Sequence, residues 1–288
     1  MLNNVQGPQV EIPLGVRLRL ARAAVQAVAD EAGADILHIK GDAVDSELRP
    51  LVRPGTDVDI LTRPAHVGRL DAALRAHGWA VYSTFTYGSP FGHAQTYTHE
   101  QWGYLDLHRF FPGIEADASG AFESLWSGRM IHHIAGVDGA VPAVSAQAVI
   151  LLLNDARSRR SADAAALWRS VGADRRSEIR SLVGRLHAEV AFAAATGDLE
   201  SQRGASSYPL WKVITTGGSR AAEWRARVRA APTLWQAARI VARAPAVNVE
   251  HLAHHHGRPP TRREIVVAFF ARPVTALAQF IAGLRARR

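Results

Sequence analysis

The sequence predicts an α+β fold in which a mixed sheet flanked by helices, residues 1–144, is followed by a mainly α-helical domain, residues 145–288. Short segments that alternate apolar and polar residues, as half-buried strands do, are confined to the first range. Longer segments with helical periodicity lie between those strands and continue alone after Val144. Strands mixed with helices, and then helices only, are typical of an α+β domain with a helical extension.

Helix ends in the first range are marked by glycine and proline. An amphipathic helix is expected from about Pro13 to Glu31, because Gly33 supplies a C-terminal capping signal. A second helix is expected between Pro64, a favoured first residue, and Gly78, which closes it. The other predicted elements are a short helix at Ala43–Leu48, strands at Asp35–Lys40, Asp57–Leu61, Trp79–Thr86, His93–Thr98 and Gly103–His108, and a hairpin within Ile131–Val144 whose turn is Asp138-Gly139.

The second range shows helical patterns throughout. Ser161 and Asp174 are polar residues of the kind that begin helices. The predicted helices are Ala146–Ser158, Ser161–Ser170 and Asp174–Ala195, followed by a Gly- and Ser-rich loop at Thr196–Tyr208 and further helices.

Asp57 and Asp59 form an Asp-x-Asp pair inside an apolar run and are the most informative feature of the chain. Residues two apart in a strand share a face, so the two carboxylates are expected side by side, with Val58 and Ile60 facing the core. A divalent cation offsets the repulsion between them, and Mg²⁺ prefers such oxygen ligands. Asp106, on another predicted strand, would complete a two-metal site for in-line displacement at phosphorus. A surface strand is the alternative interpretation of an isolated pair.

Lys40-Gly41 follows the first predicted strand, and Arg53 lies shortly before the acids. Glycine lets the backbone approach a ligand closely, the amides at a following helix start favour phosphate, and lysine adds a compact charge. Each residue alone is explained by a turn or a solvated loop. Together with the Asp-x-Asp strand, they predict a phosphate-binding site beside the acids.

This order of residues resembles the uncharacterised nucleotidyltransferase family, which belongs to the polymerase-β-like nucleotidyltransferase superfamily. The resemblance spans roughly residues 15–170 and, more loosely, the helical remainder. It implies a polymerase-β-like mixed sheet. The residues that carry it are Ile39-Lys40-Gly41, Arg53, Asp57-Val58-Asp59-Ile60-Leu61, the helix that ends at Gly78, and Leu105-Asp106-Leu107-His108.

The resemblance also implies a reaction. A nucleoside monophosphate would pass from an NTP, with ATP the expected donor, to a hydroxyl of an acceptor, and pyrophosphate would leave. The acceptor stays open among small molecules, peptides, proteins and RNA. Asp57 and Asp59 would bind Mg²⁺, with Mn²⁺ as an alternative, and Asp106 would join them or activate the acceptor. The implied nucleotide-binding residues are Lys40, Gly41 and Arg53.

The chain departs from the wider superfamily after the first strand. Gly41 is followed by Asp42, where the superfamily has serine or glycine. Asp42 would place a negative charge near the expected phosphates, whereas the Lys-Gly form itself matches the uncharacterised family.

His108 and Asp155 are supporting candidates. His108 shares a face with Asp106 and would orient a metal-bound water or the acceptor, and a buried strand histidine is the equal alternative. Asp155, with Asn154 and Arg157, interrupts an apolar helix of the second range. In related enzymes the helical half lines the nucleotide cleft, although an ordinary helix end explains these polar residues equally well.

Composition is that of an ordinary globular protein of 288 residues, with 48% hydrophobic and 21% charged residues. The net charge of +8 comes almost entirely from arginine, since the sequence has two lysines, Lys40 and Lys212. The absence of cysteine excludes disulfides and thiolate metal sites. No signal peptide or membrane-spanning segment is recognised, so a cytoplasmic location is expected.

Two features near the C-terminus have alternative interpretations. His251–His256 favours a solvated helix end over a metal site, because the turn residues Gly257–Pro260 follow. Ile265–Leu284 is apolar, but Arg272-Pro273 argues against a spanning helix. A packed terminal helix is expected there, with a membrane-surface helix as the alternative.

Two other functions fit the same sequence. A catalytically inactive or antitoxin-like module would keep the fold and bind nucleotide or protein, and the three acids argue against it. An arginine-rich nucleic-acid-binding protein would use the helical half. Nucleic acid is not indicated, however, because aromatic residues are not interleaved with the basic ones as base stacking requires.

Overall fold

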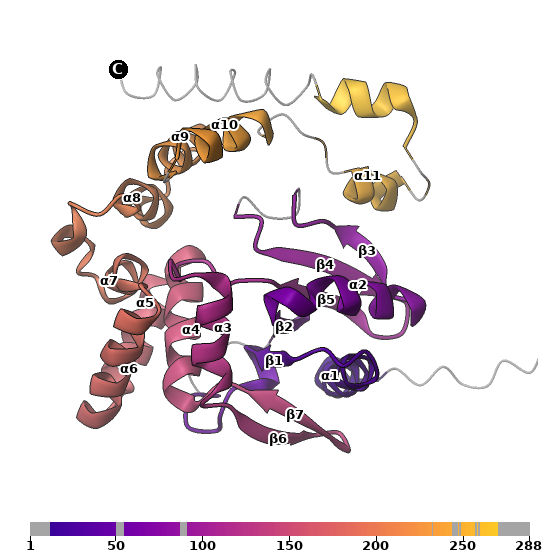
Figure 1. Cartoon of the computed structure of the whole chain (residues 1–288), viewed down its shortest axis with the longest axis horizontal. Helices are drawn as coiled ribbons and strands as arrows, with labels where there is room; N and C mark the ends of the chain where they lie inside the picture. Colours follow the sequence, from indigo (N-terminus) through magenta and orange to yellow (C-terminus); the bar gives the residue numbers. More distant parts are fainter. Residues whose placement is uncertain are drawn as a thin grey trace, which may run out of the picture.

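The computed structural model describes residues 12–49, 55–86, 91–231, 233–243, 249–256 and 260–269, with Val247 and Arg258 (Figure 1). The predicted α+β class is confirmed, because a five-stranded mixed sheet is flanked by helices and followed by helices. No helix in these ranges is long and apolar enough to cross a bilayer. Arg53, the chain beyond residue 269, and the side chains of His251, His254 and His255 lie outside the described residues.

The sheet has the strand order β1-β2-β5-β4-β3. β2 and β5 pair in parallel, and every other neighbouring pair in this sheet is antiparallel. The parallel pair therefore joins two segments that are separated in the chain by a helix and two strands. The strands are β1 Ile36–Ile39, β2 Val58–Thr62, β3 Ala80–Ser83, β4 Ala94–His99 and β5 Gly103–His108.

Both faces of the sheet are covered, because alternate residues of β1 and β2 enter two separate apolar clusters. Ile36 and Ile60 pack with helices α1, Leu14–Glu31, and α2, Val67–Ala76. Leu37 and Leu61 point the other way and join a cluster that includes helix α4. Burial on both faces explains why β1 and β2 contain few exposed polar residues.

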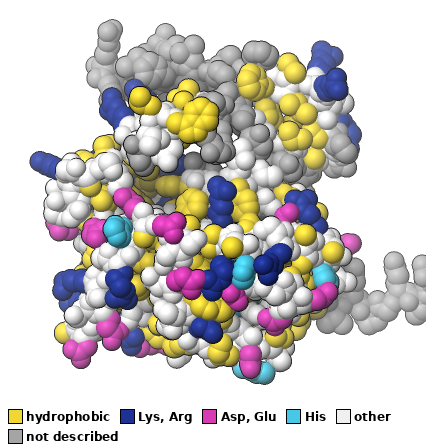
Figure 2. Space-filling model, in the orientation of Figure 1, with side chains coloured by type: hydrophobic (Ala, Val, Ile, Leu, Met, Phe, Trp, Pro, Cys, Tyr) yellow, Lys and Arg dark blue, Asp and Glu magenta, His cyan; other side chains and the backbone are white. Residues whose placement is uncertain are grey.

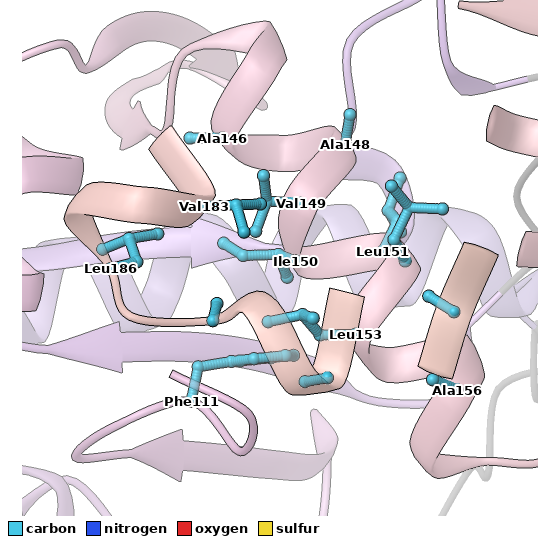
Figure 3. Packing of buried hydrophobic residues seen from close by; sticks show 14 of the residues in the cluster. Phe111, Ala146, Ala148, Val149, Ile150, Leu151, Leu153, Ala156, Val183 and Leu186 are labelled. Atoms are coloured by element: carbon cyan, nitrogen blue, oxygen red, sulfur yellow. The ribbon is translucent and has the colours of Figure 1, made fainter. Parts of the chain in front are cut away.

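Helix α4, Val144–Arg157, is the centre of the second cluster (Figures 1 and 3). Its residues from Ala146 to Asn154 are all buried, because the sheet lies on one side and helices α5 to α8 surround the other. The predicted boundary between residues 144 and 145 falls at the start of this helix, and the cluster includes side chains from both sides of it. Figure 3 shows Phe111, which follows β5, beside Leu153 of α4.

The remaining elements complete the covering layers. A two-stranded hairpin packs against β1 and α1. The remaining elements are η1 Gly41–Ala43, η3 Pro64–His66, α3 Ala118–Trp126, β6 Met130–Ile134, β7 Val137–Val141, α5 Ser161–Ser170, α6 Ala173–Arg185, α7 Glu189–Thr196, η4 Leu199–Gln202, α8 Tyr208–Thr216, α9 Arg220–Ala230, α10 Leu234–Arg243 and α11 Val249–His256.

Two predicted boundaries are wrong. The hairpin turns at Ala135-Gly136, both with positive φ, instead of at Asp138-Gly139. Gly139 pairs within the ladder, where a Cβ would come within 3.0 Å of the His38 ring. The single helix expected at Asp174–Ala195 is two helices, because the chain reverses at His187, which has φ +50°.

Candidate active site

Asp59 and Asp106 lie side by side on β2 and β5. They are direct partners in the parallel register, and both share the α4 side of the sheet with Leu61. His108, two residues after Asp106, lies on the same face. One ligand atom from each of Asp59, Asp106 and His108 lies within 4.8 Å of the other two. Within the described residues, this is the group of acids and histidines with the spacing of a metal site.

The buried carboxylate of Asp59 has two partners on one oxygen. Lys40 Nζ lies 2.5 Å from Asp59 Oδ1, and His108 Nε2 donates a hydrogen bond of 2.9 Å to the same atom. Burial raises the pKa of Asp59, but the ammonium group of Lys40 and the hydrogen bond from His108 outweigh it and hold the pKa well below its usual range. Asp59 is therefore ionised at neutral pH.

Asp106 is held by the neighbouring strand. Thr96, its cross-strand partner on β4, donates a hydrogen bond of 2.6 Å from Oγ1 to Asp106 Oδ1. This bond fixes the carboxylate on the face that it shares with Asp59. Asp106 Oδ2 takes no part in this bond.

Asp57 precedes β2 and is half-buried. Its pKa is raised to about 6, first by burial and then by the charges of Asp59 and Asp106, against the opposing effect of Lys40 and Arg22. The three acids thus share one electrostatic environment. Asp57 is not part of the group within 4.8 Å, because β2 begins one residue after it and it lies outside the paired strand.

Lys40 and Gly41 form a strained turn over a buried arginine. Lys40 has φ +60° and ψ 179°, a conformation that is almost confined to glycine. Arg22 of α1 donates a hydrogen bond of 3.2 Å from Nη2 to Lys40 O. The side chain of Arg22 is buried, and its Nε and Nη1 have no hydrogen-bond partner in the described structure. The turn therefore places the ammonium group of Lys40 in contact with Asp59, and the guanidinium group of Arg22 supports the backbone of the turn.

The short helix predicted at Ala43–Leu48 does not form. A single 3₁₀ turn, η1, follows Lys40, and the chain then continues as bends and turns. Arg49 donates side-chain hydrogen bonds to the carbonyl oxygens of Asp42 and Val44, which a helix would have used internally. Asp42 lies in η1 with an exposed side chain, so it does not cap a helix at Ala43.

We expect Gly41→Ala to destabilise the protein by about 1–3 kcal/mol. Gly41 has φ +53°, which costs about 1–2 kcal/mol for a residue with a Cβ. The new methyl group would also lie 2.6 Å from Arg22 Nη2, and Arg22 is buried and cannot move freely. Urea unfolding would measure the loss. Gly15→Ala is the control, because Gly15 lies in α1 with nothing within 4 Å and should be neutral or slightly stabilised.

Helix α4 contributes a cation to the site. Arg157 Nη1 donates to His93 Nε2 at 2.9 Å, and Arg157 Nη2 donates to Asn154 Oδ1 at 3.3 Å. Burial lowers the pKa of Arg157, while the charges of Asp59 and Asp106 raise it. Its guanidinium group therefore experiences the field of the acids.

The supporting candidate Asp155 has a different environment. Its carboxylate lies 2.8 Å from Arg160 Nη2, and burial raises its pKa against the effect of that arginine. Among the described residues Asp155 pairs with Arg160 and not with the three acids, whereas Arg157, two residues later, experiences the charges of Asp59 and Asp106.

Sequence patterns did not identify Arg22 or His93. Arg22 has a sequence signal, because it lies four residues before Gln26 and four after Leu18 on the buried face of α1. A charged residue at such a helical core position is uncommon without a partner. His93 lies immediately before β4 and has no such signal.

Comparisons with known proteins do not assign the chain to a family. No family model matches the chain, and no curated protein matches it. Among solved structures, the chain is similar to the lincosamide antibiotic adenylyltransferase LnuA, crystallised with lincomycin bound. The identity is 17%, the TM-score is 0.33, and the match covers 55% of this chain and 92% of the other. A TM-score this low does not establish a shared fold, so function has to be inferred from the site itself.

Proposed function

We propose that the protein is a metal-dependent nucleotidyltransferase that transfers a nucleoside monophosphate from an NTP to a hydroxyl group. The observation that carries this proposal is the pairing of Asp59 with Asp106 on adjacent parallel strands, with Asp57 close enough to share their field. The three carboxylates lie near one half-buried lysine, Lys40, and one histidine, His108, whose pKa is lowered by burial. The cluster is thus rich in anionic oxygen.

This donor set fits a divalent cation. Carboxylate oxygens are the ligands that Mg²⁺ and Mn²⁺ prefer, and the negative charges of Asp59 and Asp106 add to burial in raising the pKa of Asp57. Asp59 and Asp106 would hold the cation, with Asp57 as a third ligand and His108 orienting Asp59. A bound cation supplies charge neutralisation and polarises a phosphoryl oxygen.

The residues of the chain divide the remaining work. The ammonium group of Lys40 has three donors, so it can keep Asp59 and also bind a phosphate oxygen of the NTP. Gly41 lets the backbone approach that phosphate, and Arg53 is the proposed third contact. Asp106 Oδ2 would take the proton of the acceptor hydroxyl. The acceptor oxygen then bonds to the α-phosphorus, the bond from that phosphorus to the bridging oxygen breaks, and pyrophosphate leaves.

The experiment that tests the proposal has a binding step and a reaction step. Calorimetric titration of the full chain with Mn²⁺, and then with a non-hydrolysable ATP analogue, should show both binding events. Incubation with each NTP, Mg²⁺ and acceptors of each class should release pyrophosphate, and intact-mass analysis would identify the product. Asp106→Asn is the matched control, because it keeps the shape of the side chain and removes its basicity. Failure to bind either Mn²⁺ or the nucleotide would contradict the proposal.

The inactive-module alternative makes a different prediction in the same experiment. It expects nucleotide binding with no pyrophosphate release for any acceptor class. The nucleic-acid alternative gains no support from the face shown in Figure 2. On the face shown in Figure 2, Lys and Arg side chains are interspersed with Asp and Glu side chains, whereas a nucleic-acid footprint needs a continuous basic patch.

A further inference from the structure

Arg157 is a fixed cation without an anionic partner. It is the last residue of α4, and its two hydrogen bonds go to His93 and Asn154, which are neutral acceptors. In the described part of the chain it forms no ion pair. Its neighbour Arg160, by contrast, pairs with Asp155 at 2.8 Å. Because a buried charge without a counter-charge is costly, such a group usually has a ligand or a partner that completes it.

His93 positions this guanidinium relative to the acids. The pKa of His93 is lowered, first by burial and then by nearby positive charges. Its ring is therefore neutral, and Nε2 accepts a hydrogen bond from Arg157. The ring centroid of His93 lies 5.1 Å from that of His108. His108 in turn donates to Asp59. A chain of three contacts therefore connects Arg157 to the acid pair and holds it on the same side of the sheet.

The other cations near the acids are less available to a ligand. The charge of Lys40 is already balanced by Asp59 at 2.5 Å. Arg22 is 1% exposed, so no ligand can reach it without a rearrangement of α1. Arg157 is half-buried and keeps part of its surface in contact with solvent. Of these three described cations near Asp59 and Asp106, Arg157 is thus the one that is accessible to a ligand and has no anionic partner.

We propose that Arg157 binds the β- or γ-phosphate of the donor nucleotide, the part that leaves as pyrophosphate. This inference rests on the proposed function. The α-phosphate has to lie against Asp59 and Asp106 for transfer, and Arg157 experiences the charges of those acids but forms no ion pair with them in the described structure. We therefore assign to Arg157 the phosphates that follow the α-phosphate in the nucleotide. A planar guanidinium matches two phosphate oxygens, and the negative charge that develops on the leaving group strengthens the contact.

The test compares nucleotides that differ in these phosphates. The dissociation constants of a non-hydrolysable ATP analogue, AMP and pyrophosphate are measured by calorimetry with Mn²⁺, for the wild-type chain and for Arg157→Gln. We expect the variant to bind the ATP analogue and pyrophosphate about 10- to 100-fold more weakly, the usual effect of one charge-assisted contact, and to bind AMP unchanged. Arg157→Lys keeps the positive charge but loses the planar guanidinium group that can bind two oxygens. Its affinity for the ATP analogue should lie between those of the wild-type chain and Arg157→Gln.

Arg160→Gln is the matched control, since it removes an arginine from the same region that already has a carboxylate partner. A purely structural role of Arg157 would lower the melting temperature and weaken AMP and the ATP analogue by the same factor, which would overturn the inference. Unchanged affinity for the analogue in both Arg157 variants would overturn it too. If the wild-type chain binds no nucleotide at all, the proposed function fails instead. If Arg157→Gln does not fold, the test uses Arg157→Lys instead. The ratio of its affinities for the ATP analogue and AMP is then compared with the ratio for the wild-type chain.

Discussion

Asp59→Asn is expected to destabilise the metal-free protein by about 3 kcal/mol, whereas Asp57→Asn is expected to stabilise it by about 1 kcal/mol, and both should abolish nucleotidyl transfer. Each substitution removes an anionic ligand from the proposed site without changing side-chain volume. The stability effects differ in sign because the two carboxylates have opposite surroundings. Asp59 has a lysine and a histidine on one oxygen, and Asp57 has mainly other acids nearby.

The pKa shifts of Asp59 and Asp57 determine the pH range in which each carboxylate affects the stability of the fold. The folded pKa of Asp59 is lowered, so its ionised form contributes stability that is present at neutral pH and is lost only as pH falls through the folded pKa. Asparagine removes that contribution and leaves the half-buried charge of Lys40 without its carboxylate partner. The folded pKa of Asp57 is raised from 3.8 to about 6, a difference of about 3 kcal/mol before solvent screening at this half-buried group. The wild-type protein therefore loses stability as pH rises through about 6.

Urea unfolding in EDTA at pH 7.5 and pH 4 would measure both effects. The advantage of Asp57→Asn should be present at pH 7.5 and should vanish at pH 4, where Asp57 is largely protonated in the wild-type protein as well. Adding Mn²⁺ should reverse the order of wild type and Asp57→Asn. Equal stability changes for the two variants would contradict the opposite electrostatic surroundings of Asp57 and Asp59. Activity within tenfold of wild type in both variants would contradict their role as metal ligands.

Gly113→Ala is expected to destabilise the protein by about 2–5 kcal/mol. Gly113 has φ +98°, and an added Cβ would lie 2.7 Å from Ala191 Cβ, 3.0 Å from Trp211 Cζ2 and 3.4 Å from Leu153 Cδ1. Positive φ costs about 1–2 kcal/mol, and overpacking costs about 1–3 kcal/mol more. The neighbours cannot give way, because they belong to helices α7, α8 and α4 in the shared cluster.

Gly136→Ala separates the two causes. Gly136 has a similar backbone conformation, φ +92°, and nothing within 4 Å of an added Cβ. Its substitution should therefore cost only the backbone term, and the difference between the two variants in urea unfolding should be about 1–3 kcal/mol. Equal losses would mean that the loop after β5 does not pack on the helices as described.

Elements with strong local signals could be predicted from the sequence. The strand Gly103–His108 and the helix Ser161–Ser170 have the expected bounds, because alternation and a polar helix start are local properties. The helix at Ala118–Trp126 was not predicted. The hairpin turn was misplaced, because packing of Gly139 against His38 sets the register there and outweighs the local preference for Asp-Gly.

The acids of the candidate site could be named from the sequence, but their arrangement could not. Asp-x-Asp is a local pattern, whereas the pairing of Asp59 with Asp106 depends on which strands become neighbours. The same holds for Arg22 beneath Gly41 and for Arg157 beside His93, since each contact joins distant parts of the chain. The roles of all these residues stay proposals.

Because β2 pairs with β5 instead of with the strand that follows it, we expect the site to form late when the chain folds. The antiparallel pairs β1–β2 and β3–β4–β5 connect segments that are close in sequence and lose little entropy on closing. The parallel contact joins these two units, and only then do Asp59 and Asp106 meet. A refolding chain should therefore gain most of its strand signal before it gains affinity for Mn²⁺, which makes metal binding a reporter of the last step in sheet assembly.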